Sequence, residues 1–148
     1  MHTASRAGRH RPAERAPILH ATDVTLRATL LVASGAALGG VARFLVSAYL
    51  PRDFPYGTMT VNAVGSFLLA LLMFGGLLHG ALSAEVRLLV GIGILGAFTT
   101  MSAFAFDTLA LAEDGRLAGA AWNVVANPVL SIVAAYAGRA VALAVPHG

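Results

Sequence analysis

The sequence predicts an all-α integral membrane protein with four transmembrane helices. Of its 148 residues, 57% are hydrophobic and only 11% are charged, whereas charged residues make up about 25% of an ordinary soluble domain. The apolar residues gather in four segments, at about 27–49, 57–79, 86–112 and 117–144. Each segment reaches the ~20 residues that cross a ~30 Å hydrocarbon core. Short connections between segments predict that neighbouring helices run antiparallel.

Residues 1–25 precede the first segment, and we expect them to form a disordered cationic tail. The tail has few large apolar side chains from which a core could form, and its four arginines could lie against anionic lipid. A cleaved secretory signal is the alternative, but the following apolar run, from about residue 28 to 50, exceeds the ~7–15 residues of a signal core. The membrane domain is therefore expected at residues 26–145.

The basic residues are all arginines, and outside the tail they are divided evenly between the two ends of the bundle. One end holds Arg27, Arg87 and Arg139, and the other holds Arg43, Arg52 and Arg116. The positive-inside rule therefore gives the bundle itself almost no preferred orientation, so insertion both ways is permitted. Because these arginines are scattered beside apolar segments, they do not indicate a surface for nucleic acid.

The third segment contains the least regular run of the chain, residues 91–107. Glycines, hydroxyl residues and an acid interrupt it. In hydrocarbon no water replaces a lost backbone hydrogen bond, so a broken helix persists only inside protein or beside a polar cavity. We expect such a break at Gly96–Thr100. The spelling Gly91-x-Gly93-x-x-Gly96 also matches a dinucleotide-binding motif, but no strand precedes it, which excludes that interpretation.

Two stripes of polar side chains follow the second and fourth segments. Within each stripe the residues are four apart, so they lie on one face of a helix. Hydrogen bonding between helices would explain any one of these side chains, but two stripes beside a broken helix favour a pathway. N–H and O–H donors without a fixed positive charge would suit a small anion. The stripes are Thr58, Asn62 and Ser66, and Asn123, Asn127 and Ser131.

Other unusual residues have an ordinary structural explanation. Gly35, Gly39 and Gly40 of the first segment favour close packing of helices. Arg43 lies near the end of that segment, so its guanidinium could snorkel to the interface. Asp107 lies near the end of the third segment, where interfacial water would solvate it.

These residues resemble the Fluc (CrcB) family of fluoride channels over about residues 34–139. The resemblance rests on three motifs that follow one another on three consecutive segments. It implies passive export of fluoride across the cell membrane by an antiparallel, dual-topology dimer with two pores. The motifs are Gly39-Gly40-x-x-Arg43, Gly57-Thr58-x-x-Val61-Asn62-x-x-Gly65-Ser66-Phe67 and Gly96-x-x-Thr99-Thr100-x-Ser102-x-Phe104-x-x-Asp107.

The resemblance also implies roles for single residues. Asn62 matches a pore asparagine, and Phe104 matches one of two phenylalanines that present their ring edges to fluoride. The backbone carbonyls of Gly96 and Thr99, next to Thr100, match those that hold a buried sodium ion between the two subunits. The polar lining of the pore would include Thr58, Ser102, Asn127 and Ser131, and Arg43 matches the family's arginine at the end of the first helix.

The sequence departs from the family pattern at several positions. Met101 stands where a phenylalanine is usual, and its polarizable thioether could replace the ring only in part. Ala97, Ala103 and Asp107 stand where glycine, threonine and glutamate are usual, and Asn127-Pro128 is unexpected. Some members of the family pair with a second, differently oriented copy. Both a homodimer and a heterodimer with a homologous subunit therefore remain open.

A small four-helix, proton-coupled multidrug exporter is the alternative function. It would need a carboxylate deep in a helix, but Asp53 lies in a loop and Asp107 near a segment end. A non-conducting assembly subunit would leave the polar stripes and the broken helix without a purpose. An enzyme is not indicated, because the segments contain no nucleophile–base pair or cluster of metal ligands. The chain has no cysteine, which excludes disulfides and thiolate chemistry.

Overall fold

The computed structural model describes residues 25–79 and 82–145, so the predicted tail lies outside the described residues except for Thr25. The Thr25 side chain accepts a hydrogen bond from the Ala28 N–H at 3.1 Å and thereby caps the first helix. The elements are α1 (Leu26–Tyr49), α2 (Tyr56–His79), α3 (Ala84–Val86), the π-helix η2 (Arg87–Leu95), α4 (Gly96–Phe98), α5 (Met101–Glu113) and α6 (Leu117–Ala144).

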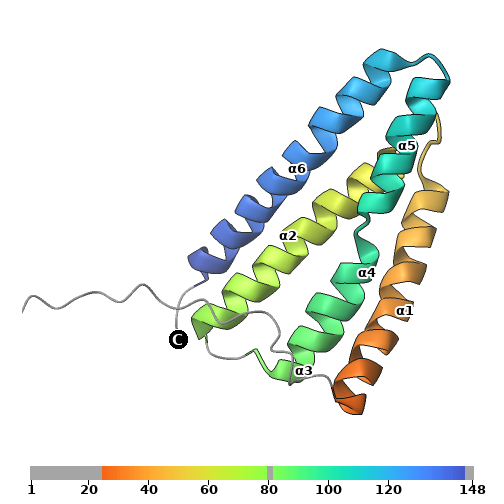
Figure 1. Ribbon diagram of the computed structural model, residues 1–148. Coiled ribbons are helices and arrows are strands. Elements are labelled where there is room, and N and C mark those ends of the chain that lie inside the picture. The colour runs from red at the N-terminus through yellow and green to blue at the C-terminus, as the bar shows by residue number, and fades with distance from the viewer. Residues whose placement is uncertain (1–24, 80–81, 146–148) are drawn as a thin grey trace, which may run out of the picture.

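Four helical stretches of the described chain are long and apolar enough to cross a membrane. They are α1, most of α2, the combined run from α3 to α5, and α6. Successive stretches run in opposite directions, with the loops at the two ends of the bundle (Figure 1). The prediction of an all-helical protein with four membrane spans is confirmed.

The third stretch changes neighbours halfway along its length. Its first half, η2 and α4, packs against α1, whereas its second half, α5, packs against α6. The helices α2 and α6 lie side by side and form the other long contact of the bundle (Figure 1). Between the two halves, Thr99 (φ −81°, ψ 156°) and Thr100 (φ −153°, ψ 120°) have extended backbone. The last carbonyls of α4 therefore have no helical partners.

Two glycines of α1 allow its close approach to η2. A Cβ atom at Gly39 would overlap the carbonyl oxygen of Ile94, and one at Gly35 would overlap that of Leu89. A Cβ atom at Gly40 would meet nothing within 4 Å. The packing interpretation is therefore confirmed for Gly35 and Gly39 and wrong for Gly40 within this chain.

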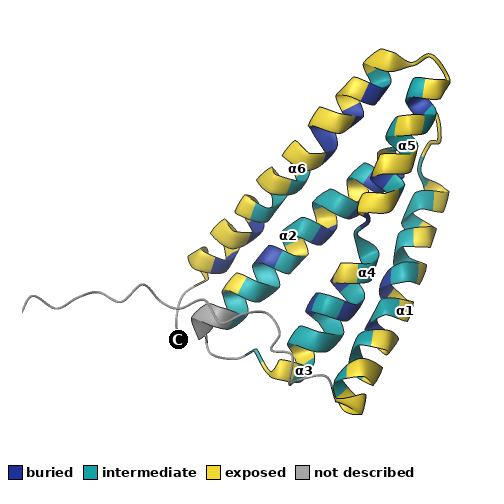
Figure 2. Ribbon diagram, viewed as in Figure 1, coloured by how far each residue is buried: buried dark blue, intermediate teal, exposed yellow. Residues whose placement is uncertain are grey.

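The interior of the bundle is partly polar, and its outside is apolar. Buried residues lie where helices face one another, while exposed residues cover the outward faces of α1, α5 and α6 (Figure 2). Among the described residues, the largest fully buried side chains are Val61 and Asn123. Lipid tails suit the apolar exterior, and a buried amide needs hydrogen-bond partners inside the protein.

Candidate functional site

Asn62 of α2 holds the extended residues between α4 and α5. Its Oδ1 accepts the N–H of Thr100 at 2.7 Å, and its Nδ2 donates to the Thr100 carbonyl at 3.1 Å. Because a backbone N–H can only donate, the first bond fixes the direction in which the Asn62 amide faces. Nδ2 also donates to Oδ1 of Asn127 on α6 at 3.1 Å. Both amide hydrogens of Asn62 are thus used inside the protein.

The orientation of the Asn127 amide follows from that of Asn62. Its Oδ1 accepts from Asn62, so its Nδ2 points the other way. Asn127 is only 2% exposed, and its Nδ2 has no hydrogen-bond partner among the described residues. Leaving a buried donor unpaired costs about 1–3 kcal/mol. The Asn127 amide is therefore placed to donate to a group that the described residues do not supply.

A cavity of about 530 Å³ lies beside this hydrogen-bond network. We call it the central groove. Met101, with 72% of its surface exposed, stands at its rim, whereas Phe104 is buried. Nine of the residues named from the sequence line this groove, so the structure brings most of the candidate site together. They are Asn62, Ser66, Gly96, Thr99, Thr100, Met101, Phe104, Asn127 and Ser131, and they are joined there by Leu69, Pro128 and Ile132.

Most hydroxyl groups near the central groove already donate within the protein. Ser131 Oγ donates to the Asn127 carbonyl at 2.8 Å. Thr100 Oγ1 accepts the Ala103 N–H at 3.1 Å, capping α5, and shares a further hydrogen bond with Ser102 Oγ at 3.2 Å. Ser102 is not among the residues that line the groove. Ser66 lines the groove, and among the described residues its hydroxyl has no hydrogen-bond partner.

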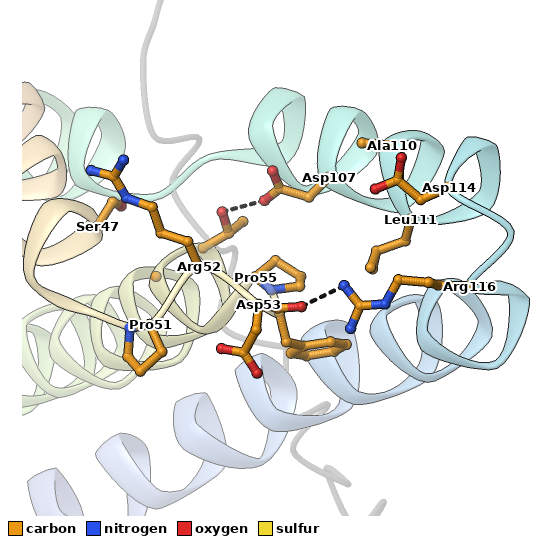
Figure 3. Close-up of a pocket in the computed structure, with 13 residues that line it drawn as sticks. Ser47, Pro51, Arg52, Asp53, Pro55, Asp107, Ala110, Leu111, Asp114 and Arg116 are labelled. Atoms are coloured by element: carbon orange, nitrogen blue, oxygen red, sulfur yellow. Dashed lines mark hydrogen bonds between the residues drawn. The ribbon is translucent and has the colours of Figure 1, made fainter.

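Thr58 and Asp107 lie together in a second cavity of about 260 Å³, which we call the loop-side pocket (Figure 3). Thr58 Oγ1 donates to Asp107 Oδ2 at 2.6 Å, and Arg116 donates to the carbonyl of Asp53. Arg52 and Asp114 also line the pocket, so it contains charges of both signs. Thr58, the first residue of the α2 polar stripe, therefore lies in the loop-side pocket and not in the central groove.

Arg43 of α1 contacts the extended residues between α4 and α5. Its Nη1 donates to the carbonyl oxygen of Thr99 at 3.4 Å, so the guanidinium lies against the extended residues. The snorkelling interpretation did not predict this contact with the Thr99 carbonyl, and snorkelling itself stays a prediction. A positive charge beside these carbonyls is stabilised by oxygen atoms that the interrupted helix leaves without partners.

The sequence interpretation missed Thr108, which connects α5 to α6. Asn123 Nδ2 donates to Thr108 Oγ1 at 2.9 Å, and that hydroxyl donates to the Phe104 carbonyl at 2.7 Å. Asn123 itself is fully buried. The four-residue spacing of Phe104 and Thr108 is compatible with this bond, but a threonine in a membrane helix bonds in this way commonly, so the spacing alone does not mark a site.

Comparison with known proteins gives a consistent result. Residues 30–139 match a family model described as CrcB-like protein, Camphor Resistance (CrcB). The chain is 49% identical over 112 residues to the fluoride-specific ion channel FluC of Anaeromyxobacter sp. (strain K), covering 73% of this chain and 89% of that protein. It is 45% identical over 112 residues to FluC of Syntrophotalea carbinolica, with the same coverage. It is 41% identical over 117 residues to FluC 1 of Methanosarcina acetivorans, covering 77% and 89%.

Proposed function

Because the chain belongs to the CrcB-like family, we infer that it is a fluoride-selective channel of the cell membrane, through which fluoride leaves the cytoplasm passively. The observation that carries the mechanism is the buried, unpaired Nδ2 of Asn127, a residue that lines the central groove. Fluoride is small and strongly hydrated, so a pore must replace its water with donors and still release the ion. Asn127 and the Ser66 hydroxyl supply such donors.

Asn62 then acts as a positioning residue. Its own amide hydrogens go to Thr100 and Asn127, so it holds Asn127 with the free N–H directed away from itself. Phe104 completes the wall of the groove, where a ring edge carries a weak positive potential towards an anion. A proton-coupled multidrug exporter is not favoured, since Asp107 accepts a hydrogen bond from Thr58 and lies in the loop-side pocket.

The direct test is fluoride efflux from liposomes that contain the purified protein. We expect fluoride to leave, with chloride retained, at a rate that rises with the protein content of the vesicles. Vesicles without protein provide the baseline. If no efflux is seen, either alone or after mixing with a homologous subunit, the proposed function is rejected.

We further propose that the chain pairs with a second copy, or with a homologous subunit, in antiparallel orientation. Met101 and Ile132 on the rim of the central groove are 72% and 57% exposed, and a partner would close that side. The equal division of the arginines outside the tail permits both orientations of the bundle. The chain has no cysteine, so single cysteines at Arg27 and Arg116, at opposite ends, can report pairing. Antiparallel pairing requires crosslinks between a cysteine at position 27 of one subunit and a cysteine at position 116 of the other. Crosslinks that join only 27 to 27 or 116 to 116 would exclude it.

We also propose that the break between α4 and α5 holds a sodium ion through the carbonyls of Gly96 and Thr99. The side-chain contacts of these oxygens are long, 3.5 Å from Thr99 Oγ1 and 3.4 Å from Arg43, so lone pairs remain for a cation. Rings of carbonyl oxygens are suitable ligands for alkali ions. A bound cation would offset the cost of an anion inside the membrane.

Removing sodium should therefore destabilise the protein. Purification in a large organic cation in place of sodium is expected to lower the midpoint of thermal unfolding, and returning sodium should restore it. Potassium serves as the control for ionic strength. Identical midpoints in all three salts would exclude a structural sodium ion.

Replacing Met101 with phenylalanine is expected to raise fluoride efflux about twofold to tenfold. A ring at the rim would add an aromatic contact of about 0.5–1.5 kcal/mol, and 1.36 kcal/mol corresponds to a factor of ten in rate. Met101→Leu, which has neither ring nor sulfur, is the matched control and should not raise the rate. Equal rates for the phenylalanine variant and the wild type would contradict a role for this position.

A further inference from the structure

The Arg139 guanidinium of α6 lies over the ring of Phe74 in α2, with 5.4 Å between its Cζ atom and the ring centroid. Both residues line a third cavity of about 350 Å³, together with Ala70, Ala135 and Tyr136. We call this cavity the terminal pocket. Among the described residues the Arg139 guanidinium has no carboxylate partner. The guanidinium lies over the face of the ring, and its N–H groups have no hydrogen-bond acceptor among the described residues, so they are free to donate.

The terminal pocket lies about one helical turn beyond the central groove along the same two helices. On α6, Ser131 lines the central groove, while Ala135 and Arg139, four and eight residues later, line the terminal pocket. On α2, Ser66 is followed in the same way by Ala70. Because α2 and α6 pack side by side (Figure 1), the two cavities follow one another along the same pair of helices.

Arg139 lies close to the end of its helix. It precedes the last residue of α6, Ala144, by five residues, which is about 8 Å at 1.5 Å per residue. This end of the bundle lies opposite the loop-side pocket. That pocket contains Asp53 and Asp107 besides its arginines, whereas the terminal pocket is lined by one arginine and no acid. The two ends of the pathway therefore differ in charge.

We propose that Arg139 is an anion-capture residue at this end of the pathway. This proposal rests on the proposed function and adds a second site for fluoride to it. The guanidinium binds the ion at the terminal pocket, from which the ion passes between Ala70 and Ala135 to the donors of the central groove. Phe74 holds the guanidinium in place, and the stacked cation covers the ring face that would repel an anion. A fixed charge at a channel mouth raises the local concentration of counter-ions and their rate of capture.

The absence of cysteine permits a test in which only the charge changes. Arg139→Cys is modified in detergent with an aminoethyl methanethiosulfonate, which restores a positive charge, or with the sulfonatoethyl reagent, which adds a negative one. Both samples are then reconstituted. At low salt we expect the positive form to release fluoride about tenfold faster than the negative form. At about 0.5 M of an impermeant salt the ratio should fall below about two, because salt screens the charge.

Arg27→Cys is the matched control. It lies at the same end of the bundle, but Arg27 pairs with Glu85 at 3.4 Å and lines neither cavity. Its positive and negative forms should conduct alike. The quantity compared is the efflux rate of the positive form divided by that of the negative form. The proposal is overturned if this ratio is the same for Arg27→Cys and Arg139→Cys, or if the ratio for Arg139→Cys does not change with salt. A difference confined to vesicles with anionic lipid would also overturn it, because Arg139 would then bind a lipid headgroup.

If Arg139→Cys does not assemble, a second pair of variants tests the same proposal. Arg139→Lys should keep both the efflux rate and its dependence on salt, whereas Arg139→Gln should lower the rate and lose the dependence. A glutamine variant as fast and as salt-dependent as the wild type would reject the capture site. Failure of the wild type to release fluoride would instead reject the proposed function, so the two failures are distinguishable.

Discussion

Replacing Asn62 with leucine is expected to lower fluoride efflux at least about 100-fold. The change removes the acceptor of the Thr100 N–H and both donors of the Asn62 amide. Each polar group left unpaired costs about 1–3 kcal/mol, and 1.36 kcal/mol corresponds to a factor of ten in rate. The extended residues and Asn127 lose their common support, so the unpaired Nδ2 of Asn127 is no longer held in its orientation. Efflux from liposomes at equal amounts of protein measures the effect.

Thr58→Val is the matched control for this variant. It removes a polar side chain from the same stripe of α2, but it breaks only the bond to Asp107 in the loop-side pocket. We expect a decrease in efflux well below that of Asn62→Leu. If the two variants lose efflux equally, polarity along α2 matters in general, and the specific support of Thr100 and Asn127 by Asn62 is not the cause.

The two polar stripes show which features of the site can be predicted from the sequence and which cannot. Four-residue spacing placed Asn62 and Asn127 on helix faces, and in the structure their side chains meet at one groove. Spacing cannot say which hydrogens remain free, because that depends on the partners that packing supplies. Only the bond from the Thr100 N–H to Asn62 Oδ1 fixes both amides. It leaves Asn62 with no free amide hydrogen and Asn127 with an unpaired Nδ2.

Arg43 illustrates a different limit of sequence interpretation. An arginine near the end of an apolar segment is ordinarily expected to reach the interface. In the structure α1 packs against η2 and α4, and this packing brings Arg43 to the Thr99 carbonyl. The contact depends on which helices are neighbours, and the hydropathy of single segments contains no information on that. The same limit applies to the two halves of the third stretch, which pack on different helices.

The close contact of α1 with η2 helps to position the residues beside the central groove. Glycines at positions 35 and 39 let α1 approach the backbone of the first half of the third stretch. Arg43, one turn beyond Gly39, then reaches Thr99. The extended residues are therefore held from both sides, by Asn62 of α2 and by Arg43 of α1. A change that moves α1 outward should disturb the groove without altering any residue that lines it.

Replacing Gly39 with alanine is expected to destabilise the protein by about 1–3 kcal/mol, as overpacking of a well-packed contact does. The new Cβ would overlap the Ile94 carbonyl oxygen, and backbone atoms cannot rotate away as a side chain can. The adjacent Gly40→Ala is the control, since its Cβ would meet nothing within 4 Å. Alanine favours a helix over glycine by about 1 kcal/mol, so the control should be neutral or stabilising.

Thermal unfolding in detergent and efflux from liposomes should both separate these two variants. Gly39→Ala is expected to lower the unfolding midpoint and to reduce efflux, because an outward shift of α1 withdraws Arg43 from Thr99. Gly35→Ala should act in the same direction, since its Cβ would overlap the Leu89 carbonyl oxygen. A Gly40→Ala variant as unstable as Gly39→Ala would show that flexibility of α1, and not its contact with η2, is what the glycines provide.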